Sequence, residues 1–150
     1  MGKETVLALL LREKERGEPV RALVVCPASL QLNWYSEAAR FAPSLHCQAL
    51  TGTAATRARQ IAGWQDGVLV TSYDQLKRDV EAYRGIELTH VFLDEAQYIK
   101  NAASQAAKAV KTLKAEHRFA LTGTPIENRL SELWSIFDFL MPGYLYAYKK

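Results

Sequence analysis

Two adjacent carboxylates, Asp94 and Glu95, close an apolar run in the segment FLDEAQYIKN (92–101). Neighbouring residues of a strand point to opposite faces of a sheet, so a continuing strand would separate the two acids. They can act in one site only if the strand ends here and the chain turns. The alternative is that both acids are solvated at a strand end, or stabilise the start of the next helix.

Polar residues follow the other apolar runs in the same way. These polar segments are Pro27-Ala28-Ser29, Thr71-Ser72-Tyr73 and Thr122-Gly123-Thr124-Pro125. These three segments and the Asp94-Glu95 pair each follow an apolar run. The four runs and one further run occupy residues 22–26, 47–50, 68–71, 91–94 and 119–122. Between the runs, apolar residues recur three or four positions apart, as in Leu30, Trp34 and Ala38, which is typical of helices.

Short strands that are apolar on both faces, alternating with amphipathic helices, are typical of a covered parallel sheet. We therefore predict an α/β fold with an open, doubly wound, mainly parallel sheet and helices on both faces. Ligands of such sheets bind beyond the carboxyl ends of the strands, where the polar segments gather.

The composition is that of one cored domain. The chain has 150 residues, of which 49% are hydrophobic. This length is enough for one domain with a hydrophobic core and too short for two ordinary domains. No apolar run approaches the roughly 20 residues of a membrane span, and no signal-peptide cleavage region follows the N-terminus. We expect a protein that is not secreted: cytoplasmic and nucleoid-associated in a bacterium, nuclear in a eukaryote. Cys26 and Cys47 lack partners at metal-ligand spacing, so we expect buried free thiols.

Four segments, in order, resemble the motifs of one family. DEAQ (94–97) and LTGTPIENRLSELWSIFDFL (121–140) are similar to motifs II and III of the Snf-type (Swi/Snf-like) chromatin-remodelling ATPases of helicase superfamily two. ALVVCPASLQLNW (22–34) resembles their motif Ia and VLVTSYDQL (68–76) their motif Ib. The resemblance covers residues 6–145 and implies the first of two RecA-like lobes, which close on ATP and move along double-stranded DNA.

The resemblance implies a role for each matched residue. Asp94 would hold the Mg²⁺ of MgATP through water, Glu95 would orient and deprotonate the attacking water, and Gln97 would relay the nucleotide state. Thr122, Gly123 and Thr124 resemble the coupling motif. The residues that would contact the DNA backbone, without reading sequence, are Pro27, Ser29, Thr71, Ser72 and Tyr73.

Each of these roles has a structural alternative. We expect Ser29 to cap the following helix and leave its first amides open to phosphate. Alternatively, Ser29 and Asp74 only cap helices, and Tyr73 only fills the core; for Trp34, on an apolar stripe, we prefer the core interpretation. The lysines of the 100–114 segment are interpreted as a solvated face outside the DNA site; these are Lys100, Lys108, Lys111 and Lys114.

The N-terminus departs from the family pattern, which has a glycine-rich loop ending in Lys-Thr or Lys-Ser before the first helix. In MGKETVLALLL, Glu4 takes the place of the hydroxyl residue and Lys3 lies one residue too close to the helix. We therefore expect the loop and its strand upstream of Met1, with Met1 and Gly2 added by cloning. The second lobe and its arginine finger would also lie outside the chain, so residues 1–150 alone would be an inactive fragment of lobe one.

Three functions stay open at this point. The first is the ATPase lobe, with ATP, Mg²⁺, double-stranded DNA and the second lobe as partners. The second is an RNA helicase lobe, against which the helix ENRLSELWSIFDFL argues. The third is a lobe without catalysis that binds DNA or protein.

Overall fold

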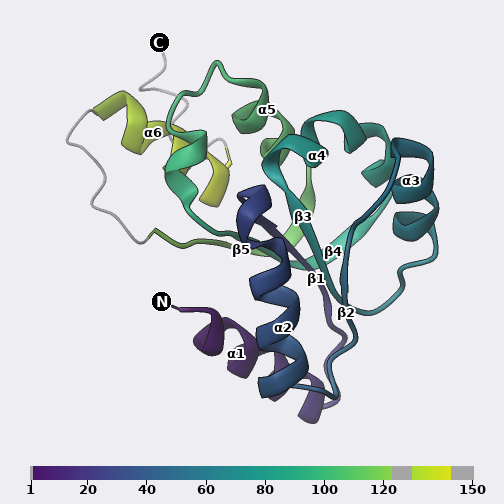
Figure 1. The fold of residues 1–150 in the computed structure, drawn as a ribbon. Coiled ribbons are helices and arrows are strands. Elements are labelled where there is room, and N and C mark those ends of the chain that lie inside the picture. Colours follow the sequence, from purple (N-terminus) through teal and green to yellow (C-terminus); the bar gives the residue numbers. More distant parts are fainter. Residues whose placement is uncertain (1, 123–129, 143–150) are drawn as a thin grey trace.

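Five parallel strands form the sheet at the centre of the protein. The computed structural model describes residues 2–122 and 130–142, in which the strands lie in the order β2-β3-β1-β4-β5 (Figure 1). Their bounds are β1 (Arg21–Cys26), β2 (Cys47–Ala49), β3 (Gly67–Ser72), β4 (Glu87–Leu93) and β5 (Lys114–Ala120). All paired neighbours run parallel, which confirms the predicted α/β sheet.

Helices cover both faces of the sheet (Figure 1). The helices are α1 (Lys3–Glu15), α2 (Gln31–Phe41), α3 (Ala54–Ala62), α4 (Tyr73–Asp79), α5 (Gln105–Lys111) and α6 (Leu130–Leu140), with 3₁₀ turns η1 (Ala28–Leu30), η2 (Val80–Tyr83) and η3 (Ala96–Ile99). On one face, Leu7 of α1 and Trp34 of α2 pack in a core cluster with Val24. On the other, α3 to α6 contribute to a second cluster that contains Leu23 and Val91.

The register of the central strands brings three carboxyl ends together. β1 lies between β3 and β4, with Cys26 paired to Ser72 and Val25 paired to Leu93. The segments that follow these strands therefore leave the sheet at one edge, which we call the carboxyl rim. This is the edge at which parallel sheets bind their ligands.

Two strand positions differ from the sequence prediction. β5 was expected at 119–122 but spans Lys114–Ala120, and β4 begins at Glu87 instead of residue 91. β5 lies at the edge of the sheet, where Lys114, Glu116 and His117 are exposed, so its outer half is polar. An apolar run marks only the covered part of such a strand.

The cysteines and the helix lengths agree with the remaining expectations. Cys26 is buried and Cys47 half-buried, and both are free thiols. Within the described part of the chain, every helix is too short or too polar to cross a membrane.

Candidate nucleotide and DNA site

Asp94 and Glu95 lie in a tight turn at the carboxyl rim. β4 ends at Leu93, as the adjacent acids required, and Glu95 takes a left-handed backbone conformation with φ of 54° before η3 begins. Among the described residues it is the one non-glycine residue with positive φ, a costly conformation that often marks functional sites. The Asp94 amide donates to the Val25 carbonyl at 2.7 Å and the Ala96 amide to the Leu121 carbonyl at 2.7 Å, so the turn is fixed on both sides.

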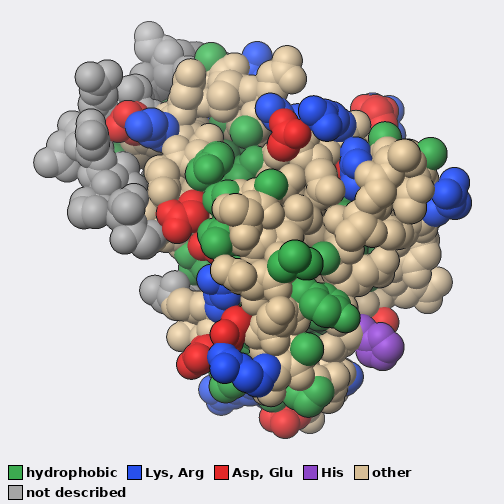
Figure 2. All heavy atoms as spheres, viewed as in Figure 1, with side chains coloured by type: hydrophobic (Ala, Val, Ile, Leu, Met, Phe, Trp, Pro, Cys, Tyr) green, Lys and Arg blue, Asp and Glu red, His purple; other side chains and the backbone are tan. Residues whose placement is uncertain are grey.

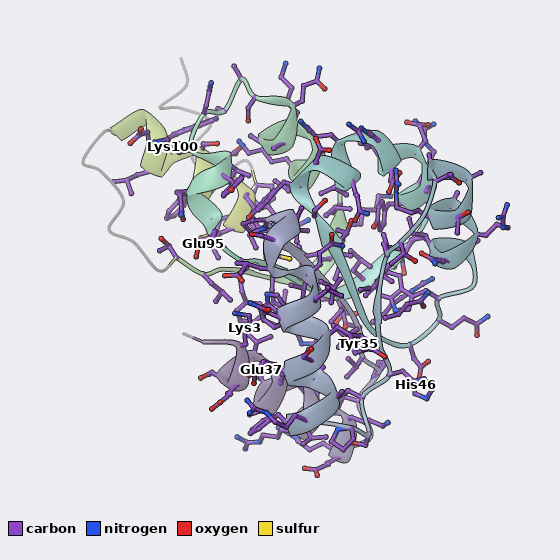
Figure 3. All side chains as sticks on the ribbon, viewed as in Figure 1. Lys3, Tyr35, Glu37, His46, Glu95 and Lys100 are labelled. Carbon is purple, nitrogen blue, oxygen red and sulfur yellow. The ribbon has the colours of Figure 1, made fainter. Side chains whose placement is uncertain are left out.

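Both carboxylates of this turn are half-buried and reach the surface together. Figure 3 labels Glu95 between the end of the sheet and η3, and Figure 2 shows acidic side chains at the same place on this face. The Glu95 amide donates to Oδ1 of Asp94 at 2.9 Å, which ties the two residues together. The prediction that the turn would bring both acids to one rim is therefore confirmed.

Two aromatic side chains hold Asp94 from helices on opposite faces of the sheet, α2 and α4. The indole Nε1 of Trp34 donates to Oδ2 of Asp94 at 2.8 Å, and the Tyr73 hydroxyl donates to the Asp94 carbonyl at 2.7 Å. Burial, and then the charge of Asp94, raise the pKa of Tyr73, so its hydroxyl stays a donor. Both rings are buried, as the core interpretation of Trp34 and Tyr73 predicted, but the polar contacts of these side chains were missed.

The Gln97 amide connects Glu95 to the end of β5. Its Nε2 donates to Oε1 of Glu95 at 2.7 Å, and its Oε1 accepts from the Thr122 hydroxyl at 3.2 Å. Thr122 is thus brought to the carboxylate turn. Gly123 and Thr124, the rest of the expected coupling motif, lie outside the described residues.

The Pro27–Ser29 segment presents an exposed hydroxyl at the rim. Ser29 is exposed within η1, while Pro27 is half-buried. The expectation that Ser29 caps α2 was wrong: the 3₁₀ turn intervenes, and α2 has Leu30 at its N-cap with no side-chain cap bond. The Ser29 hydroxyl is therefore not committed to capping α2.

The Thr71–Tyr73 segment turns its side chains inward. Thr71 and Ser72 are buried; Ser72 accepts from the Gln75 amide at 3.0 Å and forms a capping box with Gln75 at the start of α4. Ser72 rather than Asp74 is thus the cap, and Asp74 pairs instead with Lys77 and Arg78 on the surface. A DNA role for Thr71, Ser72 and Tyr73 stays a prediction.

Gln75 joins three segments of the rim, a connection that the sequence prediction missed. Its Oε1 accepts from Nε2 of Gln31 at 3.0 Å and from the Thr71 hydroxyl at 3.2 Å, and its Nε2 donates to the Leu50 carbonyl at 3.4 Å. The starts of α2 and α4 and the end of β2 are thereby tied together. The spacing Ser72-x-x-Gln75 is a capping-box pattern, so part of this role was detectable.

The lysines of the 100–114 segment divide into two groups. Lys108 and Lys114 are exposed, as predicted. Lys111 is half-buried and pairs with Asp138 of α6 at 3.4 Å, while Lys100 pairs with Glu132 at 3.7 Å. The solvated-face interpretation was wrong for Lys111, because α6 packs over this side of η3 and α5.

Lys3 stands at the amino end of α1 (Figure 3). Its Nζ lies 5.7 Å from the centre of the Trp34 ring, whereas Glu4 is exposed. Burial raises the pKa of Cys26 to about 12; the charge of Asp94 adds to this shift and that of Lys3 opposes it. Lys3 and Asp94 thus act on the same buried thiol from the rim side of the sheet.

Comparisons with known proteins match nearly the whole chain. The family model of the SNF2-related domain matches residues 4–150. The TATA-binding protein-associated factor mot1 of Schizosaccharomyces pombe is 44% identical over 137 residues, 88% of this chain and 7% of that protein. The putative ATP-dependent helicase/translocase YwqA of Bacillus subtilis is 39% identical over 143 residues, 93% of this chain and 16% of that protein.

A solved structure agrees in fold as well as in sequence. The Sulfolobus solfataricus SWI2/SNF2 ATPase core in complex with dsDNA superposes with a TM-score of 0.83 at 38% identity, covering 96% of this chain and 30% of that one. The chain therefore spans 7% to 30% of the length of these three proteins.

Proposed function

Because the chain belongs to the family of the SNF2-related domain, we propose that it is the first RecA-like lobe of a DNA-dependent ATPase that couples ATP hydrolysis to movement along double-stranded DNA. The relatives named as an ATP-dependent helicase/translocase and as an ATPase core bound to dsDNA support this proposal. They are several times longer than this chain, and we propose that other parts of the full-length protein supply the phosphate-binding loop and the second lobe.

The observation that carries the proposal is the turn at Asp94 and Glu95, where two neighbouring carboxylates have different partners. The Asp94 carboxylate accepts from Trp34 and from the Glu95 amide, whereas the Glu95 carboxylate accepts, among the described residues, from Gln97 alone. Phosphoryl transfer needs one acid near the metal and one free to orient water, which suits Asp94 and Glu95 in that order. Gln97, which is hydrogen-bonded to both Glu95 and Thr122, would relay the nucleotide state to the segment after β5.

The oxygen donors of this turn fit magnesium. Mg²⁺ in nucleotide sites binds one or two carboxylates, keeps several waters and takes its other ligands from phosphates. Asp94 would hold it through water: Oδ1 and Oδ2 each accept one hydrogen bond from the protein and keep a lone pair for a metal-bound water. When bound, the ion would neutralise charge on the phosphates.

The DNA side of the proposal rests on the Pro27–Ser29 segment. Ser29 is exposed, so its hydroxyl could donate to a phosphate. The first amide of α2, that of Gln31, instead donates to the Ala28 carbonyl of η1. Such contacts read no sequence. Thr71, Ser72 and Tyr73 would contribute through their backbone, since their side chains are engaged inside the rim.

The test compares Glu95→Gln with wild type in the full-length protein, with saturating duplex DNA. We expect Glu95→Gln to bind MgATP with unchanged affinity while kcat falls at least about 100-fold, the scale of general-base catalysis. Glu18→Gln, an exposed glutamate away from the rim, is the control. A kcat within severalfold of wild type would refute the role of Glu95. Residues 1–150 alone should release no phosphate above a no-enzyme blank, and hydrolysis that copurified with them would instead make Lys3 a working phosphate ligand.

A further inference from the structure

Trp34 connects the DNA side of the rim to Asp94. We infer that Trp34 is a positioning residue: its indole N–H sets the orientation of the Asp94 carboxylate, and α2 transmits the position of the Pro27–Ser29 segment to it. The inference rests on the proposed roles of Asp94 and of this segment. It adds a residue that contacts neither nucleotide nor DNA.

The hydrogen bond is built to fix an orientation. The Trp34 ring has no exposed surface and packs with Val24, Ala38 and Phe92, so the indole cannot swing away from Oδ2. The other oxygen, Oδ1, accepts from the Glu95 amide at 2.9 Å. With one protein donor on each oxygen, the plane of the carboxylate is set, and each oxygen retains a lone pair for a metal-bound water.

Helix α2 supplies the connection to the rim. Ser29 precedes Trp34 by five residues, and a helix rises about 1.5 Å per residue, so the two lie within roughly two helical turns. Tyr73 makes a parallel connection from α4, which follows the Thr71–Ser72 segment, to the Asp94 carbonyl. Helices α2 and α4, which both begin at the DNA side of the rim, therefore each direct one hydrogen-bond donor to Asp94.

Burial alone does not account for the Trp34 contact. A buried indole usually finds a partner for its N–H. Yet Trp64 is also buried, and its Nε1 has no hydrogen-bond partner among the described residues. In the described part of the chain, burial of an indole therefore does not by itself bring an acceptor to its N–H. Trp64→Phe removes such a group and is the matched control for Trp34→Phe.

The test measures magnesium dependence of nucleotide binding, not turnover. The full-length protein is mixed with a fluorescent ATP analogue, and Mg²⁺ is titrated while fluorescence is recorded. For Trp34→Phe the half-saturating Mg²⁺ should rise about tenfold, as when a hydrogen-bond partner of a metal-binding group is removed. Trp64→Phe should match wild type. If Trp34→Phe melts at a lower temperature than Trp64→Phe, benzothienylalanine at position 34 replaces it, because this isostere keeps the bicyclic ring and has sulfur in place of the N–H donor.

The outcomes separate the two proposals. If wild type shows no Mg²⁺-dependent binding, the proposed function fails and this inference fails with it. If wild type and Trp64→Phe respond to Mg²⁺ and the Trp34 variants respond at the same concentration, the positioning role alone is refuted. The same titration with duplex DNA tests transmission through α2: DNA should shift the half-saturating Mg²⁺ in wild type and Trp64→Phe, and a shift of equal size in the Trp34 variants would refute that part.

Discussion

Arg57 of α3 and Asp79 of α4 form an ion pair that is withdrawn from water. Nε of Arg57 lies 2.7 Å from Oδ2 and Nη2 lies 3.0 Å from Oδ1, and the two side chains are only 7% and 3% exposed. The third guanidinium nitrogen, Nη1, donates to the Gly52 carbonyl at 2.8 Å. Gly52 has φ of +86°, so the pair holds a turn that glycine favours, between β2 and α3.

Removing one partner of this ion pair should lower the free energy of unfolding substantially. Arg57→Met leaves the Asp79 carboxylate buried without a counter-charge, and we expect the free energy of unfolding of residues 1–150 to fall by about 3–5 kcal/mol. Adding Asp79→Leu should recover part of that loss, because the orphaned charge is then gone. Urea unfolding measures both. The control is Arg59→Met, an exposed arginine on the same helix, expected within about 0.5 kcal/mol of wild type; equal losses at Arg57 and Arg59 would contradict the prediction.

Because Glu95 has a left-handed backbone conformation, we expect Glu95→Gly to be more stable than Glu95→Ala, the reverse of the usual order. An L side chain at positive φ costs about 1–2 kcal/mol, which glycine avoids. Glu95→Gly and Glu95→Ala lose the same contact with Gln97, but only alanine retains a Cβ. We therefore expect Glu95→Gly to be the more stable of the two by about 1 kcal/mol, measured by urea unfolding.

At Glu18 we expect the usual order of stability, in which the alanine variant is more stable than the glycine variant. Glu18 is exposed and does not have positive φ, so Glu18→Gly should be less stable than Glu18→Ala through the entropy of the unfolded chain. If glycine were also the less stable variant at position 95, the turn would not carry the strain inferred from its geometry.

What could be predicted from the sequence was the position of the site, because the pattern of strands and polar strand ends is local. Asp94 and Glu95 indicated a strand end, since a strand cannot keep neighbours on one face, but that pair alone also fitted a solvated strand end. The polar segments after β1 and β3 made a shared site the better prediction, because the carboxyl ends of parallel strands meet at one edge. β5 was misplaced because an edge strand has exposed residues and lacks a continuous apolar run.

The direction of polar side chains at the site could not be predicted, because it depends on contacts between segments far apart in sequence. Trp34 looks like any core residue on an apolar stripe, and its acceptor lies 60 residues away. Thr71 was expected to face a ligand but donates to Gln75 inside the rim. Arg57 and Asp79 left a weak signal, since each is a charged residue on the apolar side of a helix, where it needs a partner.

His90 should make stability fall in mild acid. It is buried on β4 beside His117 of β5, with Nδ1 2.7 Å from the Thr89 hydroxyl. Burial, and then the charge of His117, lower the pKa of His90, while Glu13 of α1 and Glu116 of β5 oppose the shift. Since the folded pKa lies below the unfolded value of about 6.5, the neutral ring contributes stability above that pH, which is lost as pH falls below it.

Urea unfolding at pH 7.5 and pH 5.5 measures this contribution. His90→Phe, which keeps a ring beside Phe92 and Phe119, should reduce the loss of stability between the two pH values. His46→Phe, outside this aromatic cluster and exposed, is the control. An unchanged pH dependence in His90→Phe would show that another group is responsible.

Ser29 offers the sharpest test of the DNA side of the rim, because it is exposed and does not cap α2. In Ser29→Glu a carboxylate would face DNA phosphate. A charge pair about 4 Å apart in water is worth about 1 kcal/mol, so the DNA concentration that half-saturates ATPase stimulation in the full-length protein should rise about fivefold. Ser44→Glu, exposed beyond the other end of α2, adds the same charge away from the rim and should leave the value unchanged.

Salt distinguishes a local phosphate contact from a general change in charge. The effect of Ser29→Glu should shrink as ionic strength rises, because added ions screen an exposed charge pair. The wild-type dependence on salt should itself be shallow, since few lysines are committed to phosphates in this site. The variant Thr71→Glu would test folding instead, because the Thr71 side chain is fully buried and hydrogen-bonded to Gln75. Equal half-saturation for Ser29→Glu, Ser44→Glu and wild type at low salt would mean that the Pro27–Ser29 segment does not contact DNA.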